Sequence, residues 1–200
     1  MDLIGKIAPP ATRGHCFIIV ATDYFTKWVE AVPMKTVSQT DIIQFLKSHI
    51  NHRFGLLETI TCDNGSAFTG DEVIAFAAEL GITLTHSTPY YAQGNGQAEA
   101  SNKILKGCLA KVVDDNPRRW ADMLSEVLWA FRTSQRTSTT TTPFALTYGH
   151  DAVLPMEISV RLTRVAYQEG LKPKAYSEAM LAELDDLDEE QLASLDRMKV

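Results

Sequence analysis

Long hydrophobic runs, cysteines and excess positive charge are all scarce in this sequence of 200 residues. No run of about 18 apolar residues is present, so no transmembrane helix is predicted, and the first residues lack the pattern of a secretion signal. The three cysteines, Cys16, Cys62 and Cys108, are odd in number and far apart, which argues against a zinc or disulfide framework. We therefore expect an intracellular protein, nuclear or cytoplasmic, with reduced thiols and no membrane partner.

The formal net charge of −6 is unusual for a protein that binds nucleic acid, because phosphates attract Lys and Arg. Residues 151–200 hold 11 acidic and 6 basic residues, so most of the negative charge belongs to this segment. The preceding residues are nearly neutral and can still gather positive charge on one face. A nucleic-acid partner is therefore not excluded, and 45% hydrophobic residues indicate a globular chain with a sizeable core.

Hydrophobic periodicity predicts an α/β domain in the first two thirds of the chain. A hairpin is expected from "HCFIIVATD" and "KWVEAVPM", and two further strands from "ETITC" and "ITLTHS". Helices are expected after Ser38, which can cap one that ends near Gly55, and at residues 71–80, 96–114 and 118–133. This order favours a mixed sheet covered by helices on its faces.

The later residues are less regular. Thr142 can cap a short helix with Pro143 at its first position. We expect a core domain over residues 1–137, a Ser/Thr-rich connection and extension over 138–174, and an acidic amphipathic helix over 175–200. The leucines of that last helix form an apolar stripe, which needs a partner in the core or in another chain.

Residues with catalytic potential gather in two segments, "TITCDNGSAF" and "TPYYAQGNGQAEASNK". Asp63 ends a predicted buried strand, where open α/β sheets often carry catalytic groups, although Asp-Asn-Gly is also a common turn. Glu99 lies in the first turn of a predicted helix, where a carboxylate also interacts favourably with the helix dipole. Asp23 ends an apolar strand and is a further candidate by position. Asp2, judged locally, is a solvated charge near a terminus.

Asp63 and Glu99 are separated by 35 residues, and a distinct motif surrounds each of them. Together with "MDLIG", "DYFTKW", "AFRTSQRTSTTTTPFALTYG" and "AVLPMEI", these motifs resemble the catalytic core of retroviral and LTR-retrotransposon integrases, particularly the gypsy type, over residues 1–160. The resemblance implies a ribonuclease H-like fold. It also implies a mixed five-stranded sheet flanked by helices, with a C-terminal helical extension beyond the integrase core.

The resemblance further implies that Asp2, Asp63 and Glu99 are the catalytic, metal-binding triad, and that Asp23 is only a hairpin residue. Carboxylate oxygens suit Mg²⁺, for which Mn²⁺ can substitute. Two such ions about 4 Å apart activate a water or a 3′-hydroxyl and stabilise the leaving oxygen. The implied enzyme is a polynucleotidyl transferase that trims the ends of retroelement DNA and joins their 3′-hydroxyls to target DNA.

The same resemblance implies contacts with DNA on the helix of Glu99. Lys103 and Lys106 follow Glu99 at helical spacing and share one face with it, although they can equally form ordinary Glu–Lys pairs. Tyr90 can stack on a base or anchor its loop. The implied DNA-binding residues are Asn64, Tyr90, Asn95, Gln97, Lys103 and Lys106.

The resemblance also implies retroelement and target DNA, and a homodimer or higher oligomer, as partners. Gypsy-type integrases carry an upstream zinc domain and a downstream DNA-binding region that these residues do not include. We therefore expect a core fragment or a truncated copy with weakened activity. Two alternatives stay open: a ribonuclease H-like nuclease, and a domesticated or decayed DNA-binding or interaction module without turnover.

Overall fold

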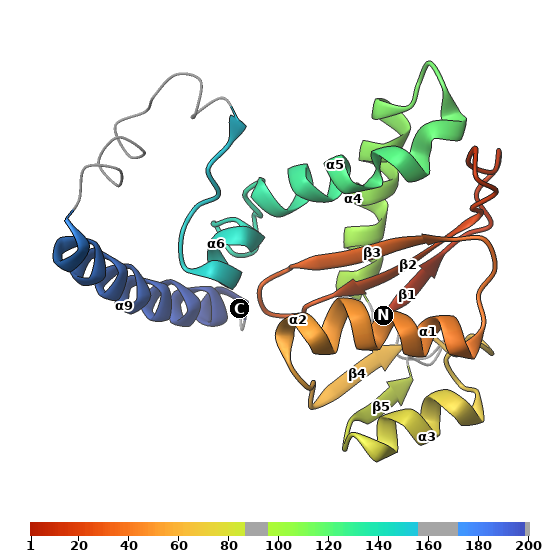
Figure 1. Ribbon diagram of the computed structural model, residues 1–200, viewed down its shortest axis with the longest axis horizontal. Coiled ribbons are helices and arrows are strands. Elements are labelled where there is room, and N and C mark those ends of the chain that lie inside the picture. Colours follow the sequence, from red (N-terminus) through yellow and green to blue (C-terminus); the bar gives the residue numbers. More distant parts are fainter. Residues whose placement is uncertain (87–95, 156–171, 199–200) are drawn as a thin grey trace. The chain divides into compact units, whose positions relative to one another are not determined.

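The computed structural model describes residues 1–86, 96–155 and 172–198. These residues fall into two compact units (Figure 1). The first unit comprises residues 1–24 and 29–129, and the second comprises residues 25–28 and 130–200. No helix within the described ranges has an apolar stretch long enough to cross a membrane.

The strands of the first unit form two small sheets. An antiparallel sheet has the order β1 (Asp2–Ile4), β2 (Phe17–Thr22) and β3 (Val29–Met34). Its register places Asp2 opposite Val20. A parallel pair consists of β4 (Thr59–Cys62) and β5 (Thr83–His86).

The expected single five-stranded sheet is not confirmed, since the described strands pair as three and two. The amino group of Met1 donates a hydrogen bond to the Thr61 carbonyl, so the start of β1 lies beside β4. β1 has only three residues, and the ladder that they form is with β2. The fold is nevertheless of the mixed α/β type, because it contains antiparallel and parallel strand pairs together with flanking helices.

Helices cover both faces of the antiparallel sheet, with α1 (Gln39–Phe45) in front and α4 (Gly96–Val112) behind (Figure 1). α1 continues through the π-helical η1 (Leu46–Asn51) into α2 (His52–Phe54). The predicted limits are confirmed: the Ser38 hydroxyl accepts from the Asp41 N–H, and Gly55 ends the helical segment at φ 86°. α3 (Asp71–Glu79) follows β4.

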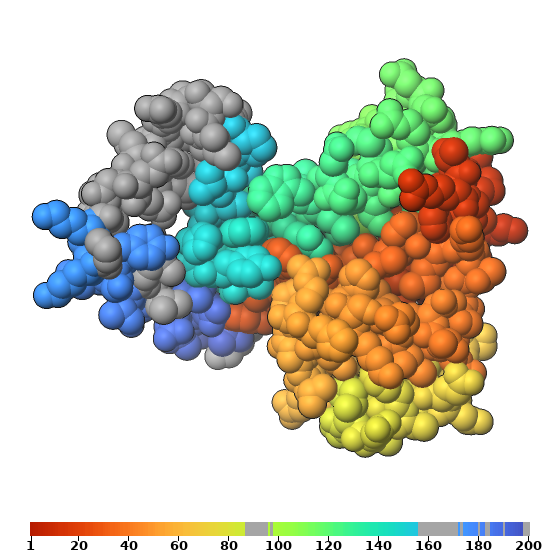
Figure 2. Space-filling view, in the orientation of Figure 1, coloured from red at the N-terminus to blue at the C-terminus, as the bar shows by residue number. Residues whose placement is uncertain are grey.

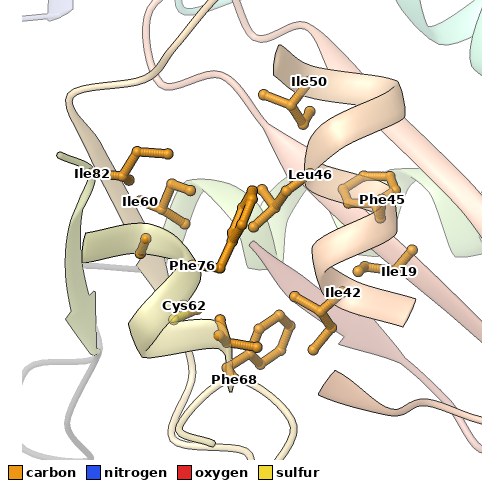
Figure 3. Packing of buried hydrophobic residues seen from close by; sticks show 12 residues of the cluster. Ile19, Ile42, Phe45, Leu46, Ile50, Ile60, Cys62, Phe68, Phe76 and Ile82 are labelled. Atoms are coloured by element: carbon orange, nitrogen blue, oxygen red, sulfur yellow. The ribbon is translucent and has the colours of Figure 1, made fainter. Parts of the chain in front are cut away.

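The buried core of the first unit joins both sheets to these helices (Figure 3). Ile19 of β2 and Ile60 of β4 belong to one cluster with Phe45 and Leu46 from the first helical segment and Phe76 from α3. This packing holds the ends of β1 and β4 close together without a shared ladder. The two strand ends carry Asp2 and Asp63, two of the predicted site residues.

The second half of the chain adds α4, the short η3 (Pro117–Arg119) and α5 (Trp120–Thr133), close to the predicted helices at 96–114 and 118–133. α4 packs on β2. Its apolar face buries Leu105 and Leu109, while its lysines are exposed.

The second unit contains α6 (Pro143–Tyr148) and α9 (Pro173–Met198). As predicted, Thr142 caps α6 by accepting from the Ala145 N–H at 3.0 Å. α9 packs against α6 and the segment before it, where Arg197 donates to the Thr139 carbonyl at 2.8 Å. The amphipathic helix therefore finds a partner within its own unit.

Trp28 belongs to the second unit although it lies just before β3. The Arg132 guanidinium lies 4.3 Å from the centre of the Trp28 ring, a cation–π distance. Tyr148 meets the same ring edge-on, with 5.5 Å between the ring centres. These contacts fix residues 25–28 against residues 130–148 of the same unit.

Candidate functional site

Asp2 and Asp63 meet where two strands come together. Asp2 opens β1 and Asp63 directly follows β4, and both side chains are half-buried. The bond from the Met1 amino group to the Thr61 carbonyl holds these strand ends side by side. The structure thus brings together two of the three carboxylates that the sequence predicts.

The environment of Asp2 disfavours its negative charge. Burial is the largest cause that raises the pKa of Asp2, and the charge of Asp63 raises it further. Two hydrogen bonds partly oppose this rise: the Leu3 N–H donates to Oδ1 at 2.8 Å, and the Asn102 amide donates to Oδ2 at 2.5 Å. The result is still a raised pKa, which a cation next to both carboxylates would lower again.

Asp63 is held by the turn that follows it. Its Oδ1 accepts a hydrogen bond from the Gly65 N–H at 3.0 Å. A Cβ atom at Gly65 would lie 2.9 Å from that oxygen, so glycine lets the backbone approach the carboxylate closely. The Asp-Asn-Gly turn therefore orients the Asp63 carboxylate. Asp63 is thus part of a common turn and also a predicted site residue, and the two interpretations are compatible.

Asn102 is a site residue that the sequence reasoning missed. Its side chain is only 4% exposed, its Nδ2 contacts Asp2, and its Oδ1 has no hydrogen-bond partner among the described residues. The available signal was its spacing, because Asn102 follows Glu99 by three residues and shares its helix face. The contact ties α4 to β1 across 100 positions of sequence.

Glu99 occupies the first turn of α4, as predicted, and is exposed. In residues 1–86, 96–155 and 172–198, no group of three or more His, Cys, Asp or Glu side chains is close enough to hold a metal ion. Glu99 therefore does not close a triad with Asp2 and Asp63 in this structure. It lies one turn before Asn102, on the helix face that leads to Asp2.

The two aspartates nevertheless fit a hard divalent cation. Their oxygens are of the type that Mg²⁺ prefers, and their mutual repulsion is the feature that a cation relieves. The unpartnered Oδ1 of Asn102 adds a neutral oxygen beside them. The donor set is thus chemically suitable, although it contains two carboxylates and not three.

The other predicted residues are only partly within the described chain. Asn64, Lys103 and Lys106 are exposed, so their side chains are accessible to a ligand. Tyr90 and Asn95 lie outside the described residues, as does the side chain of Gln97. Asp23 follows β2 in the connection to β3, which is the hairpin position expected for it.

Comparison with known proteins gives a family match and several relatives. Residues 1–92 match the family model described as the integrase core domain. The Pro-Pol polyprotein of feline foamy virus is 34% identical over 157 residues, which cover 78% of this chain and 13% of that protein. The Transposon Tf2-3 polyprotein of Schizosaccharomyces pombe is 27% identical over 160 residues, covering 79% of this chain and 12% of the polyprotein. The chain thus spans a small part of the curated relatives it matches.

Two solved structures are similar to the chain. A chain of the simian T-cell lymphotropic virus intasome in complex with PP2A regulatory subunit B56 gamma has a TM-score of 0.62 and 28% identity, covering 77% of this chain and 55% of that one. The catalytic core domain of BIV integrase has a TM-score of 0.57 and 23% identity, covering 72% of this chain and 90% of that one. The second likeness concerns the fold alone, which is that of an integrase catalytic core.

Proposed function

We propose that this chain is the catalytic core of a DNA strand transferase. The premise is the support that the family match and the relatives give to the retroviral integrase superfamily. The core processes the ends of retroelement DNA and joins their 3′-hydroxyls to target DNA. Within the superfamily we assign it to the gypsy type of LTR retrotransposon, on the motifs that surround Asp63 and Glu99. The single observation that carries the proposal is the convergence of Asp2 and Asp63 beside Asn102.

Asp2, Asp63 and Glu99 are the proposed ligands of Mg²⁺, or of Mn²⁺ in its place. Divalent ions, when bound, lower the pKa of the attacking water or 3′-hydroxyl and stabilise the leaving oxygen. Asp2 and Asp63 supply the negative charge that holds cations at this point. Asn102 orients Asp2, and the Gly65 N–H orients Asp63, so both carboxylates are positioned before DNA arrives.

The exposed residues around this centre are the proposed DNA contacts. Lys103 and Lys106 pair with backbone phosphates, and Asn64 reaches the DNA from the turn after β4. Tyr90 and Asn95, from the segment before α4, and Gln97, at the start of α4, complete the proposed interface. We propose residues 1–137 as the catalytic core, 138–174 as a connection and extension, and 175–200 as an acidic helix. The chain acts as a dimer or higher oligomer on DNA, in the nucleus or cytoplasm.

A joining assay tests this proposal. Short DNA duplexes with free 3′-hydroxyls are incubated with a supercoiled plasmid and Mg²⁺, and joined products are counted for the wild type and for Asp63→Asn. Asp23→Asn is the matched control, because it removes a carboxylate of the hairpin. We expect Asp63→Asn to lower joining by at least about 100-fold, as loss of metal geometry does, and Asp23→Asn to leave it unchanged.

Other results would contradict the proposal and identify its alternatives. Mg²⁺-dependent cutting without joining would indicate a ribonuclease H-like nuclease. DNA binding without any turnover would indicate a domesticated or decayed module. Equal joining by both variants would exclude Asp63 from the catalytic centre.

A further inference from the structure

α9 keeps part of its apolar surface exposed although the helix packs on α6. Its docked face is held by Gln191, which donates to the Leu146 carbonyl at 3.2 Å, and by Ser194, whose side chain is buried. Leu192 and Leu195 lie on the neighbouring face and are 63% and 39% exposed. Figure 2 shows part of α9, in blue, on the surface of the second unit. This face of the helix is therefore available to a partner.

The exposed leucines of α9 share their face with an acidic residue. Asp188 lies one turn before Leu192 and two turns before Leu195, and it is exposed as well. We call these three residues the α9 stripe. The sequence of α9 contains eight acidic residues and two basic ones. Two such helices repel each other, so the stripe fits a partner that is apolar and basic and does not fit another copy of itself.

The exposed face of α4 has the complementary character. Ile104, Gly107 and Lys111 are exposed and recur at spacings of three and four residues, so they form one row, which we call the α4 row. Ile104 is 43% exposed, and the space beside Gly107 is open. α4 has three lysines and one glutamate, the largest excess of basic residues among the α-helices in the described part of the chain.

The two rows match when the helices run in opposite directions. The α9 stripe reads acidic, apolar, apolar, at spacings of four and then three residues. The α4 row, read from its C-terminal end, gives basic, small, apolar at the same spacings. Each charge then faces its opposite, and the more exposed leucine lies over the glycine. The opposed pairs are Asp188 with Lys111, Leu192 with Gly107, and Leu195 with Ile104.

We propose that the α9 stripe of one copy docks on the α4 row of a second copy of this chain. The leucines and Ile104 form the apolar centre of the contact, and Asp188 pairs with Lys111 at its edge. α4 packs on β2 and α9 packs on α6 through their other faces, so both rows are free to meet a second copy. Each copy carries both rows, and the contact can therefore form twice in one dimer.

Docking of α9 also controls access to the proposed DNA face. Lys103 is exposed and lies one turn before Gly107, so a helix over Gly107 covers it. Because Lys103 is a proposed DNA contact, this self-association and DNA binding exclude each other. That consequence rests on the proposed function, whereas the contact between two copies does not, and its test contains no DNA.

Sedimentation equilibrium of the full chain at physiological salt tests the charged pair. Lys111→Glu and Asp188→Lys each bring like charges together, and each should weaken self-association about tenfold. The double variant with both changes restores the pair with its charges exchanged and should associate within about twofold of the wild type. Asp186→Lys is the matched control, because it makes the same charge change on the opposite side of α9 and should alter the affinity by less than about twofold.

A second pair of variants tests the apolar centre. Leu192→Ala should weaken self-association at least about fivefold, because it removes the side chain that lies over Gly107. Leu181→Ala is the matched control, since Leu181 is 62% exposed on the same helix but lies outside the stripe. All the substituted side chains are exposed, and circular dichroism verifies that each variant is folded.

Each of four results would overturn the proposal. A wild type that stays monomeric would exclude the contact, as would self-association that neither charge reversal weakens. A double variant that recovers no affinity would show that Asp188 and Lys111 do not face each other. Equal losses in Leu192→Ala and Leu181→Ala would show that the stripe is not the contact surface.

Discussion

The side chain of Asp2 contributes to the pH dependence of the stability of the metal-free protein. Burial and Asp63 raise the pKa of Asp2 in the folded state, so the folded protein holds this proton more tightly than the unfolded chain does. The stabilising contribution is complete below the ordinary pKa of 3.8 and is lost as the pH rises through the raised value. Ionised Asp2 therefore destabilises the metal-free fold at neutral pH.

We predict that Asp2→Asn stabilises the metal-free protein at pH 7 and has less effect at pH 3. The neutral amide avoids the repulsion from Asp63, and the unpartnered Oδ1 of Asn102 can accept a hydrogen bond from it. Urea unfolding at both pH values measures the change. A loss of stability at pH 7 would show that the charge of Asp2 is not the unfavourable feature.

Asn102 is expected to matter through Asp2, because its amide donates to that carboxylate. Asn102→Ala should raise the pKa of Asp2 further and lower Mg²⁺-dependent joining by about tenfold, a usual cost of losing the partner of a metal ligand. Asn116→Ala is the matched control, since the Asn116 side chain caps no helix. The pH profile of joining should shift upwards in Asn102→Ala only. An unshifted profile with reduced joining would indicate a purely structural role.

At the scale of elements, the first helical segment depends on its N-cap. Ser38 and Asp41 form a reciprocal capping box, in which the Asp41 carboxylate accepts from the Ser38 N–H at 2.9 Å. Ser38→Ala should lower the free energy of unfolding by about 1 kcal/mol. Thr40→Ala, two positions later on the exposed surface, should not lower it. Equal losses in the two variants, measured by urea unfolding, would show that the cap does not act as described.

The elements could be predicted where their signals are local. The cap at Ser38, the stop at Gly55 and the Thr142-Pro143 start of α6 each depend on a few neighbouring residues, and all three are confirmed. The joining of strands into sheets is not local, because β1 and β4 are far apart in sequence. Asn102 was missed for the same reason, since spacing revealed its helix face but not its contact with Asp2.

At the scale of the whole molecule, the proposed function requires a chain with a net charge of −6 to bind DNA. Few lysine side chains are available on the exposed face of α4. Each of them should therefore have a measurable effect on the salt dependence of DNA affinity. We predict that Lys103→Ala reduces the slope of log affinity against log salt concentration by about 1, as loss of one phosphate contact does. Lys174→Ala on α9 is the control with the same charge change. Equal slopes for Lys103→Ala and the wild type would remove Lys103 from the DNA interface.

The central claim is that Asp2, Asp63 and Glu99 share a divalent cation although Glu99 does not join the two aspartates in this structure. Isothermal titration calorimetry with Mg²⁺ at pH 7 tests it most directly, on the wild type, Asp2→Asn, Asp63→Asn, Glu99→Gln and Asp23→Asn. The three triad variants should lose at least about tenfold in Mg²⁺ affinity, and Asp23→Asn should bind as the wild type does. Equal affinity in the wild type and the triad variants, or a loss in Asp23→Asn as large as theirs, would contradict the account.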